Sequence, residues 1–208
     1  AEGKDDWVRL YRPIIELLGA VPNDYLQYFF YRDRKLQEFL AAEQTRGEAC
    51  KDIETRLLSY YADLRNVTVP DMLSERGGHL YSEAAIALIA SLSGAAPGNH
   101  VVDVQNQGVL DFLSDDSVIE TSCFVERGSF RRNPVKAKPN AVLKALISGV
   151  KAYEKLTVQA ALSGDRITAL QALACNPITA DLDKAEPCLA EMLHQNRPLL
   201  SRFFPADQ

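Results

Sequence analysis

The sequence predicts an α+β fold, mostly helical with a small antiparallel sheet. Apolar residues recur at helical spacing through the first and last thirds of the 208-residue chain. The convincing strands lie in the middle third, where residues 100–105 are rich in valine and residues 118–126 alternate between two faces. Because the strands are few and close together in sequence, we expect one small sheet packed on many helices.

Glycines divide the first third of the chain into helices. Gly19, with a proline three residues later, is typical of a helix end, and Gly47 is expected to interrupt a later helix. An aromatic-rich helix between these two glycines is interpreted as core and interface packing, since aromatic side chains bury large areas. The expected helices of this third are residues 7–18, 25–31, 36–40 and 53–64.

The rest of the chain predicts a hairpin among further helices. Residues 93–99 have the composition of a loop, and Arg127 with Gly128 is the expected turn into a third strand around Phe130. The expected helices here are residues 81–92, 142–160, 167–175 and 188–193.

Length and composition indicate an ordinary globular domain. Hydrophobic residues make up 47% and charged residues 25% of the chain, which excludes a disordered or fibrous protein. A net charge of −5 argues against a protein whose main task is to bind nucleic acid. The longest purely apolar run, residues 84–90, is far shorter than the ~20 residues that cross a bilayer. The charged start of the chain does not resemble a signal peptide, so we expect a cytoplasmic protein.

The four cysteines predict neither a zinc site nor a redox pair. Cys50, Cys123, Cys175 and Cys188 lie far apart and form no C-x-x-C pair. We expect all four to be reduced and to pack as small buried apolar side chains. The sequence also contains none of the common glycine-rich nucleotide motifs, metalloprotease motifs or hydrolase serine motifs.

The segment that could carry chemistry is residues 76–82 (RGGHLYS). Gly77 and Gly78 would let the backbone approach a ligand closely, and the helix that follows presents free N–H groups and a partial positive charge. Tyr81 would lie at that positive helix end, which favours an ionised phenol. The alternative is a simple loop with a packed tyrosine. Asn106, in a second polar loop after the first strand, could offer its amide to a ligand or serve only in a turn.

Four segments together resemble the C-terminal half of glycoside hydrolase family 4, in its 6-phospho-β-glucosidase branch. They follow the order of that family along the chain. The resemblance implies the C-terminal fold of the lactate/malate dehydrogenase-like family 4 glycosidases. It also implies that residues 1–208 are a single substrate-binding and oligomerisation domain, without the N-terminal NAD-binding domain. The segments are residues 18–26 (LGAVPNDYL), 76–85 (RGGHLYSEAA), 101–108 (VVDVQNQG) and 151–160 (KAYEKLTVQA).

The family's chemistry, as the resemblance implies it, differs from the two-carboxylate mechanism of most glycosidases. NAD oxidises the C3 hydroxyl of the sugar, Mn²⁺ polarises the ketone, and a base removes the C2 proton. Elimination, water addition and re-reduction complete hydrolysis. Tyr81 matches the family's catalytic base. Arg76 is a candidate for the sugar phosphate, because a guanidinium suits a bidentate anion contact, or else a solvated loop arginine. Gly77, Gly78 and Asn106 complete the expected substrate-binding residues.

Departures from the family pattern define what the isolated chain is expected to lack. The family's metal-binding cysteine and histidine lie upstream of residue 1, and Gln107 stands where the family has the second asparagine of a pair. We therefore expect the isolated chain to bind neither NAD nor Mn²⁺ and to be inactive. The expected partners are a phosphorylated disaccharide or glycoside, the N-terminal domain and further copies in a homo-oligomer, with no nucleic acid or membrane. The alternative function is a non-catalytic helical interaction or regulatory module.

Overall fold

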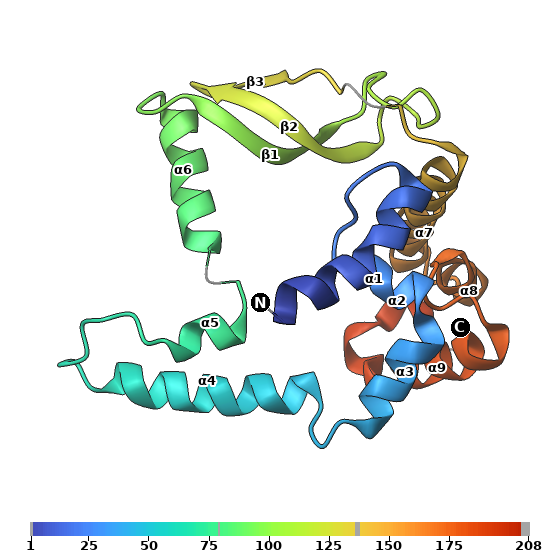
Figure 1. Ribbon diagram of the computed structural model, residues 1–208. Helices are drawn as coiled ribbons and strands as arrows, with labels where there is room; N and C mark the ends of the chain where they lie inside the picture. Colours follow the sequence, from blue (N-terminus) through green and yellow to red (C-terminus); the bar gives the residue numbers. More distant parts are fainter. Residues whose placement is uncertain (1, 79, 136–137, 205–208) are drawn as a thin grey trace. The chain divides into compact units, whose positions relative to one another are not determined.

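A computed structural model describes residues 2–78, 80–135 and 138–204, with the side chains of α1 described from Trp7 onward. Its described residues are mostly helical with one three-stranded antiparallel sheet, which confirms the predicted fold class (Figure 1). The elements are α1 (Glu2–Leu18), α2 (Leu26–Phe30), α3 (Arg32–Ala41), α4 (Arg46–Ala62), α5 (Met72–Arg76), α6 (Tyr81–Ser93), β1 (Gly98–Gln105), β2 (Val118–Glu126), β3 (Ser129–Arg132), α7 (Ala141–Ser163), α8 (Arg166–Cys175), α9 (Leu182–Gln195) and two short 3₁₀ helices (Arg197–Leu199, Ser201–Phe203).

The chain divides into two compact units. The helical unit consists of the described residues within Ala1–Lys35, Asn106–Ser117 and Lys136–Gln208. The sheet unit consists of Leu36–Gln105 and Val118–Val135, again where described. The connection between β1 and β2 therefore belongs to a different unit from the two strands that it joins.

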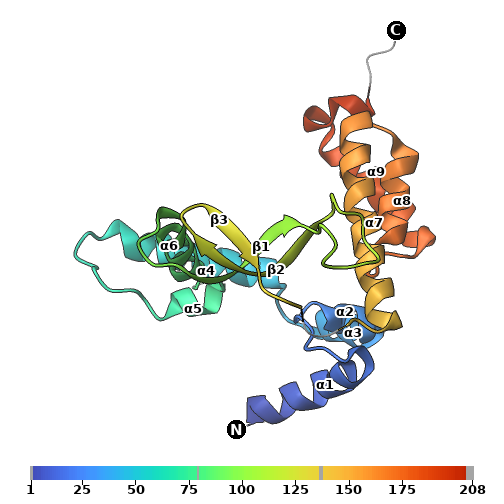
Figure 2. The same ribbon diagram turned by 90° about the horizontal axis from the view of Figure 1, so that it is seen from above.

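The core of the helical unit forms around α1. Tyr11, Ile14 and Leu18 recur at helical spacing and are almost fully buried on one face. Asn140 joins this helix to α7, because its side-chain oxygen accepts the Leu143 N–H while its amide donates to the Leu17 carbonyl. Figure 2 shows α7, α8 and α9 lying side by side in this unit.

The sheet unit is organised around β2, which pairs with β1 on one edge and β3 on the other. Ile119, Cys123 and Val125 alternate along β2 and are buried, as the sequence pattern predicts. The hairpin turn also confirms its prediction, since Arg127 and Gly128 have φ values of 48° and 76°. Positive φ at both central residues matches the twist of the flanking strands.

Two predictions about local features are wrong. Gly47 does not interrupt a helix but lies in the first turn of α4, because Thr45 and Glu48 form a reciprocal capping box that starts this helix at Arg46. The cysteines are all unpaired, as expected, but Cys175 and Cys188 are exposed. Helical periodicity places these two residues on outer helix faces, which residue type alone does not reveal.

Helix α6 is unusual because it is apolar yet largely exposed. Of its thirteen residues only Ser91 is buried, whereas Ile86 and Ile89 are 65% and 58% exposed. An apolar helix in a globular protein normally covers another surface. None of the described helices is long and apolar enough to cross a membrane.

Candidate functional site

The Gly77–Gly78 turn joins α5 to α6 and shapes the candidate site. Both glycines adopt positive φ, 83° and 73°, which side-chain-bearing residues rarely tolerate. At Gly78 a Cβ atom would also lie 2.8 Å from a carbon of the Tyr81 ring. The ring therefore lies directly over Gly78, and the Tyr81 N–H donates to the Gly78 carbonyl at 3.1 Å. Glycine is favoured at Gly77 by its positive φ and at Gly78 by both reasons.

Tyr81 occupies the first position of α6 and is 79% exposed. The tyrosine is thus not packed into a core, and its phenol can be reached by a ligand. Among the described residues, no side chain caps the N-terminus of this helix. The partial positive charge at this helix end is therefore not offset by a capping side chain and can interact with other groups. His79, which lies within the candidate segment, is outside the described residues.

Arg76 is the last residue of α5 and has an exposed side chain. Its carbonyl accepts a hydrogen bond from the Arg46 guanidinium at 3.2 Å, and the carbonyl of Glu75 accepts a second one at 2.8 Å. The carboxylate of Glu75 also pairs with Arg56 at 3.5 Å. Sequence reasoning missed Arg46 and Arg56. The T-x-x-E spacing of the capping box could have placed Arg46 at a helix start, but nothing in the sequence pairs it with α5.

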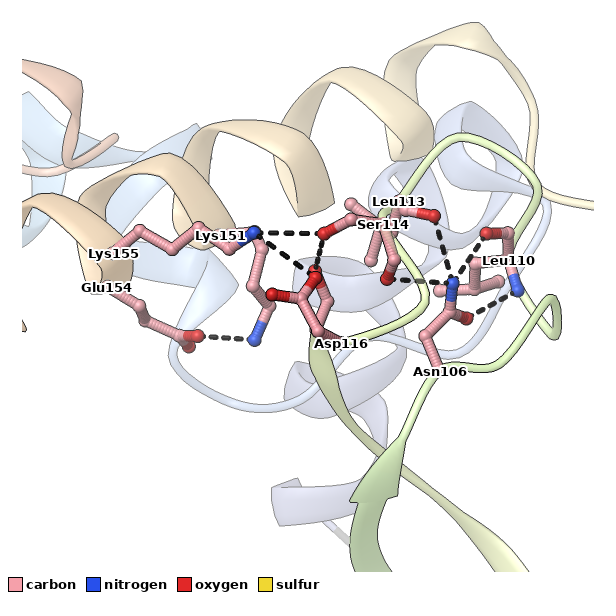
Figure 3. A network of polar contacts seen from close by, with 9 residues as sticks. Asn106, Leu110, Leu113, Ser114, Asp116, Lys151, Glu154 and Lys155 are labelled. Carbon is pink, nitrogen blue, oxygen red and sulfur yellow. Dashed lines mark hydrogen bonds and ion pairs between the residues drawn. The ribbon is translucent and has the colours of Figure 1, made fainter.

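Asn106 holds the β1–β2 loop from inside rather than facing a ligand. Its side chain is completely buried (Figure 3). The amide nitrogen donates to the carbonyls of Leu110, Leu113 and Ser114 at 2.9, 3.0 and 3.3 Å, and the side-chain oxygen accepts the Leu110 N–H at 2.7 Å. Because these bonds occupy both polar groups of the side chain, the expected presentation of this amide to a ligand is not what the structure shows.

Lysines of α7 anchor this loop from outside. The Lys155 ammonium donates to the Ser114 hydroxyl at 2.9 Å and lies 3.8 Å from the Asp116 carboxylate (Figure 3). A hydrogen bond from Ser114 and the charge of Lys155 lower the pKa of Asp116. In the middle of the loop, Lys144 pairs with Asp111 at 3.3 Å. The loop is therefore held at both its middle and its end.

The structure brings four of the five predicted site residues together. Arg76, Gly77, Gly78 and Tyr81 lie within one helix–turn–helix segment of the sheet unit. Asn106 lies in the helical unit.

Ligands for a metal ion do not gather in the described part of the chain. No three or more His, Cys, Asp or Glu side chains of those residues lie close enough together to hold a metal ion. Since Mn²⁺ prefers oxygen and imidazole donors arranged around one point, the described residues do not fit the metal that the family chemistry requires.

Comparisons with known proteins agree on one family. The family 4 glycosyl hydrolase C-terminal domain matches residues 4–179. The chain is 31% identical over 193 residues to a probable 6-phospho-beta-glucosidase of Bacillus subtilis, covering 91% of this chain and 43% of the relative. It is 32% identical over 177 residues to the 6-phospho-beta-glucosidase BglT of Thermotoga maritima, covering 85% and 42%.

Solved structures give the same result. A Thermotoga maritima 6-phospho-beta glucosidase with NAD and glucose-6-phosphate superposes with a TM-score of 0.75 at 30% identity, over 85% of this chain and 42% of that one. A 6-phospho-alpha-glucosidase from gut microorganisms, in complex with NAD and glucose-6-phosphate, gives 0.77 at 25% identity, over 94% and 45%. The chain spans less than half the length of the relatives it matches. Fold, segment order and family match lead to one conclusion: this chain belongs to glycoside hydrolase family 4 and carries its C-terminal domain.

Proposed function

We propose that this chain is the C-terminal part of an NAD- and Mn²⁺-dependent 6-phospho-β-glucosidase that hydrolyses phosphorylated glycosides by oxidation, elimination, addition and reduction. The observation that carries the proposal is the exposed Tyr81 on the glycine turn, in a chain whose relatives are 6-phospho-beta-glucosidases. An exposed phenol whose ring lies over Gly78 is suited to meet a substrate in a defined orientation.

Within this proposal, each residue of the turn has a separate role. Tyr81 acts as the base that removes a proton from the sugar carbon next to an oxidised position. Arg76 contacts the sugar phosphate, Gly77 leaves open space through which the sugar approaches, and Gly78 lies under the Tyr81 ring. Asn106 contributes indirectly by keeping its loop in one conformation.

We propose that NAD and Mn²⁺ are held mainly outside the described residues of this chain. A Thermotoga maritima relative has been solved with manganese, NAD+ and glucose-6-phosphate, and that protein is more than twice as long as the segment it shares with this chain. We propose that the corresponding N-terminal domain of a longer protein supplies both groups here. Cysteines that are all unpaired support a reducing compartment, the cytoplasm.

One observation favours the second candidate function, a non-catalytic interaction or regulatory module. The described residues hold no cluster of metal ligands, so the described part of the chain does not by itself provide the proposed metal site. An apolar and exposed α6 would suit such a module equally well.

A comparison of two proteins tests the proposed function. The longer protein that contains this chain is expected to hydrolyse an aryl 6-phospho-β-glucoside only with NAD and Mn²⁺ present, as measured by release of the aglycone. The isolated chain is expected to show no hydrolysis and no saturable binding of NAD or Mn²⁺ in calorimetry, because its sequence contains no phosphate-cradling motif and its described residues form no ligand cluster. Micromolar NAD binding by the isolated chain would contradict the second expectation. An inactive longer protein would favour the interaction module.

We also propose that the domain self-associates. The exposed apolar surface of α6 is the kind of patch that a monomer rarely displays, and symmetric dimers are the commonest assemblies. Light scattering of this chain at micromolar concentration is expected to return at least the mass of a dimer. Ile86→Glu, which places a charge on that helix, is expected to lower the mass, whereas the exposed Val21→Glu in the helical unit is not. A clean monomer for the unmodified chain would refute the proposal.

A further inference from the structure

We propose that Arg46 is a positioning residue that holds the Gly77–Gly78 turn, and with it Arg76 and Tyr81, in the orientation that the reaction needs. This inference rests on the proposed function for its catalytic consequence. Its structural part, that one arginine of α4 sets the conformation of the turn, stands on the contacts alone.

Arg46 bonds the main chain immediately before the turn. One of its terminal nitrogens donates to both the Glu75 carbonyl at 2.8 Å and the Arg76 carbonyl at 3.2 Å. These are the last two residues of α5, and Gly77 follows directly. Figure 1 shows α5 running beside α4, so the contact joins two neighbouring helices of the sheet unit.

The turn needs such a contact because its own conformation is weakly determined. Two consecutive glycines lose more conformational entropy on ordering than any other pair. A helix of five residues is also too short to be stable alone, so α5 cannot fix the turn from its side. Instead, the positively charged guanidinium of Arg46 binds two carbonyls at the C-terminus of α5. This is the end of a helix at which the helix dipole favours a positive charge.

Arg46 is itself held in place. It is the first residue of α4, and the reciprocal capping box of Thr45 and Glu48 defines the backbone at this point. A second contact between the two helices is the ion pair of Arg56 with Glu75. The two arginines lie ten residues apart on α4 and both bind Glu75, Arg46 at its carbonyl and Arg56 at its carboxylate, so a rotation of α5 would disturb both contacts.

The conformation of the turn determines where the side chains of Arg76 and Tyr81 lie. Arg76 carries one of the bonded carbonyls, so its backbone is fixed where its side chain begins. Gly78 supports the Tyr81 ring from below and accepts the Tyr81 N–H. A loosened turn would therefore displace both side chains at once.

Fluorine NMR of this chain tests the structural part. With 3-fluorotyrosine in place of its eight tyrosines, the Tyr81 signal is identified by its loss in Tyr81→Phe. Arg46→Gln is expected to shift or broaden the Tyr81 signal and leave those of Tyr60 and Tyr61, at the other end of α4, unchanged. Arg46→Lys retains a charge near the carbonyls and is expected to restore the Tyr81 signal in part. Arg65→Gln, which removes an exposed ion pair with Asp63 in the same unit, is the matched control and should change nothing at Tyr81.

Kinetics of the longer protein test the catalytic part. Arg46→Gln is expected to lower kcat/KM for the phosphorylated substrate about tenfold, with Arg46→Lys recovering part of the loss, because hydrogen bonds from a charged donor are worth about that factor. An unchanged Tyr81 signal in Arg46→Gln would overturn the inference even if Tyr81 is the base. Shifts of Tyr60 and Tyr61 together with Tyr81 would also overturn it, since α4 as a whole would have changed. A shifted Tyr81 signal with full activity in Tyr81→Phe would instead refute the proposed function and leave the positioning role intact.

Discussion

Tyr81→Phe is expected to lower kcat of the longer protein by about 10²- to 10⁴-fold, the usual contribution of a positioned base. The substitution removes the phenolic oxygen and keeps the ring that lies over Gly78. Because Tyr81 is 79% exposed and its hydroxyl supports no described core contact, thermal stability should change little. The measurement is steady-state hydrolysis of a phosphorylated β-glucoside with NAD and Mn²⁺ in excess.

A matched control and an isotope experiment sharpen this test. Tyr25 is similarly exposed, at 73%, and Tyr25→Phe removes a hydroxyl from the helical unit, so its turnover should stay near that of the unmodified protein. With deuterium at C2 of the substrate, Tyr81→Phe should show an isotope effect at least as large as the unmodified protein, because breaking the C–H bond becomes more rate-limiting. Near-normal turnover of Tyr81→Phe would remove this residue from the mechanism.

Asn106→Ala is expected to lower the free energy of unfolding of this chain by about 3 kcal/mol. The substitution leaves the partly buried Leu110 N–H and the carbonyls of Leu110, Leu113 and Ser114 without the Asn106 side chain as partner, and it opens space beneath the loop. An unsatisfied buried polar group costs about 1–3 kcal/mol, and several are lost together here. Denaturant unfolding followed by circular dichroism measures the change.

Two further variants show whether the loss of stability comes from the hydrogen bonds of Asn106 or from a general sensitivity of the chain to substitution of an asparagine. Asn106→Asp keeps the shape but turns an oxygen toward three carbonyls, so it should destabilise the chain at neutral pH at least as much as alanine does. Asn23 is exposed, and its side-chain oxygen accepts a hydrogen bond from the Tyr25 N–H at 3.1 Å. Asn23→Ala should therefore lower the free energy of unfolding by less than about 1 kcal/mol. A loss below 1 kcal/mol for Asn106→Ala would show that the loop does not depend on its buried amide.

Local features of the sequence predicted most of the elements. Val118–Glu126 and its turn at Arg127 and Gly128 follow from alternation and from turn chemistry, which act over a few residues. The helix end at Gly19, where φ is 66°, follows in the same way. The boundary near Gly47 was wrong because a capping box outweighs one glycine in a first turn.

The sequence by itself determined the fold class, the glycine turn and the family, since each depends on residue types at short spacing or on ordered motifs. Only the tertiary structure decided which polar side chains face inward. Asn106 is an internal support of its loop because carbonyls four to eight residues away converge on its amide. Arg46 reaches Glu75 and Arg76 across about thirty residues of chain, because α5 folds back beside α4. Hydrogen bonds act over about 3 Å in space, whatever the separation in sequence, and only the fold creates such proximity.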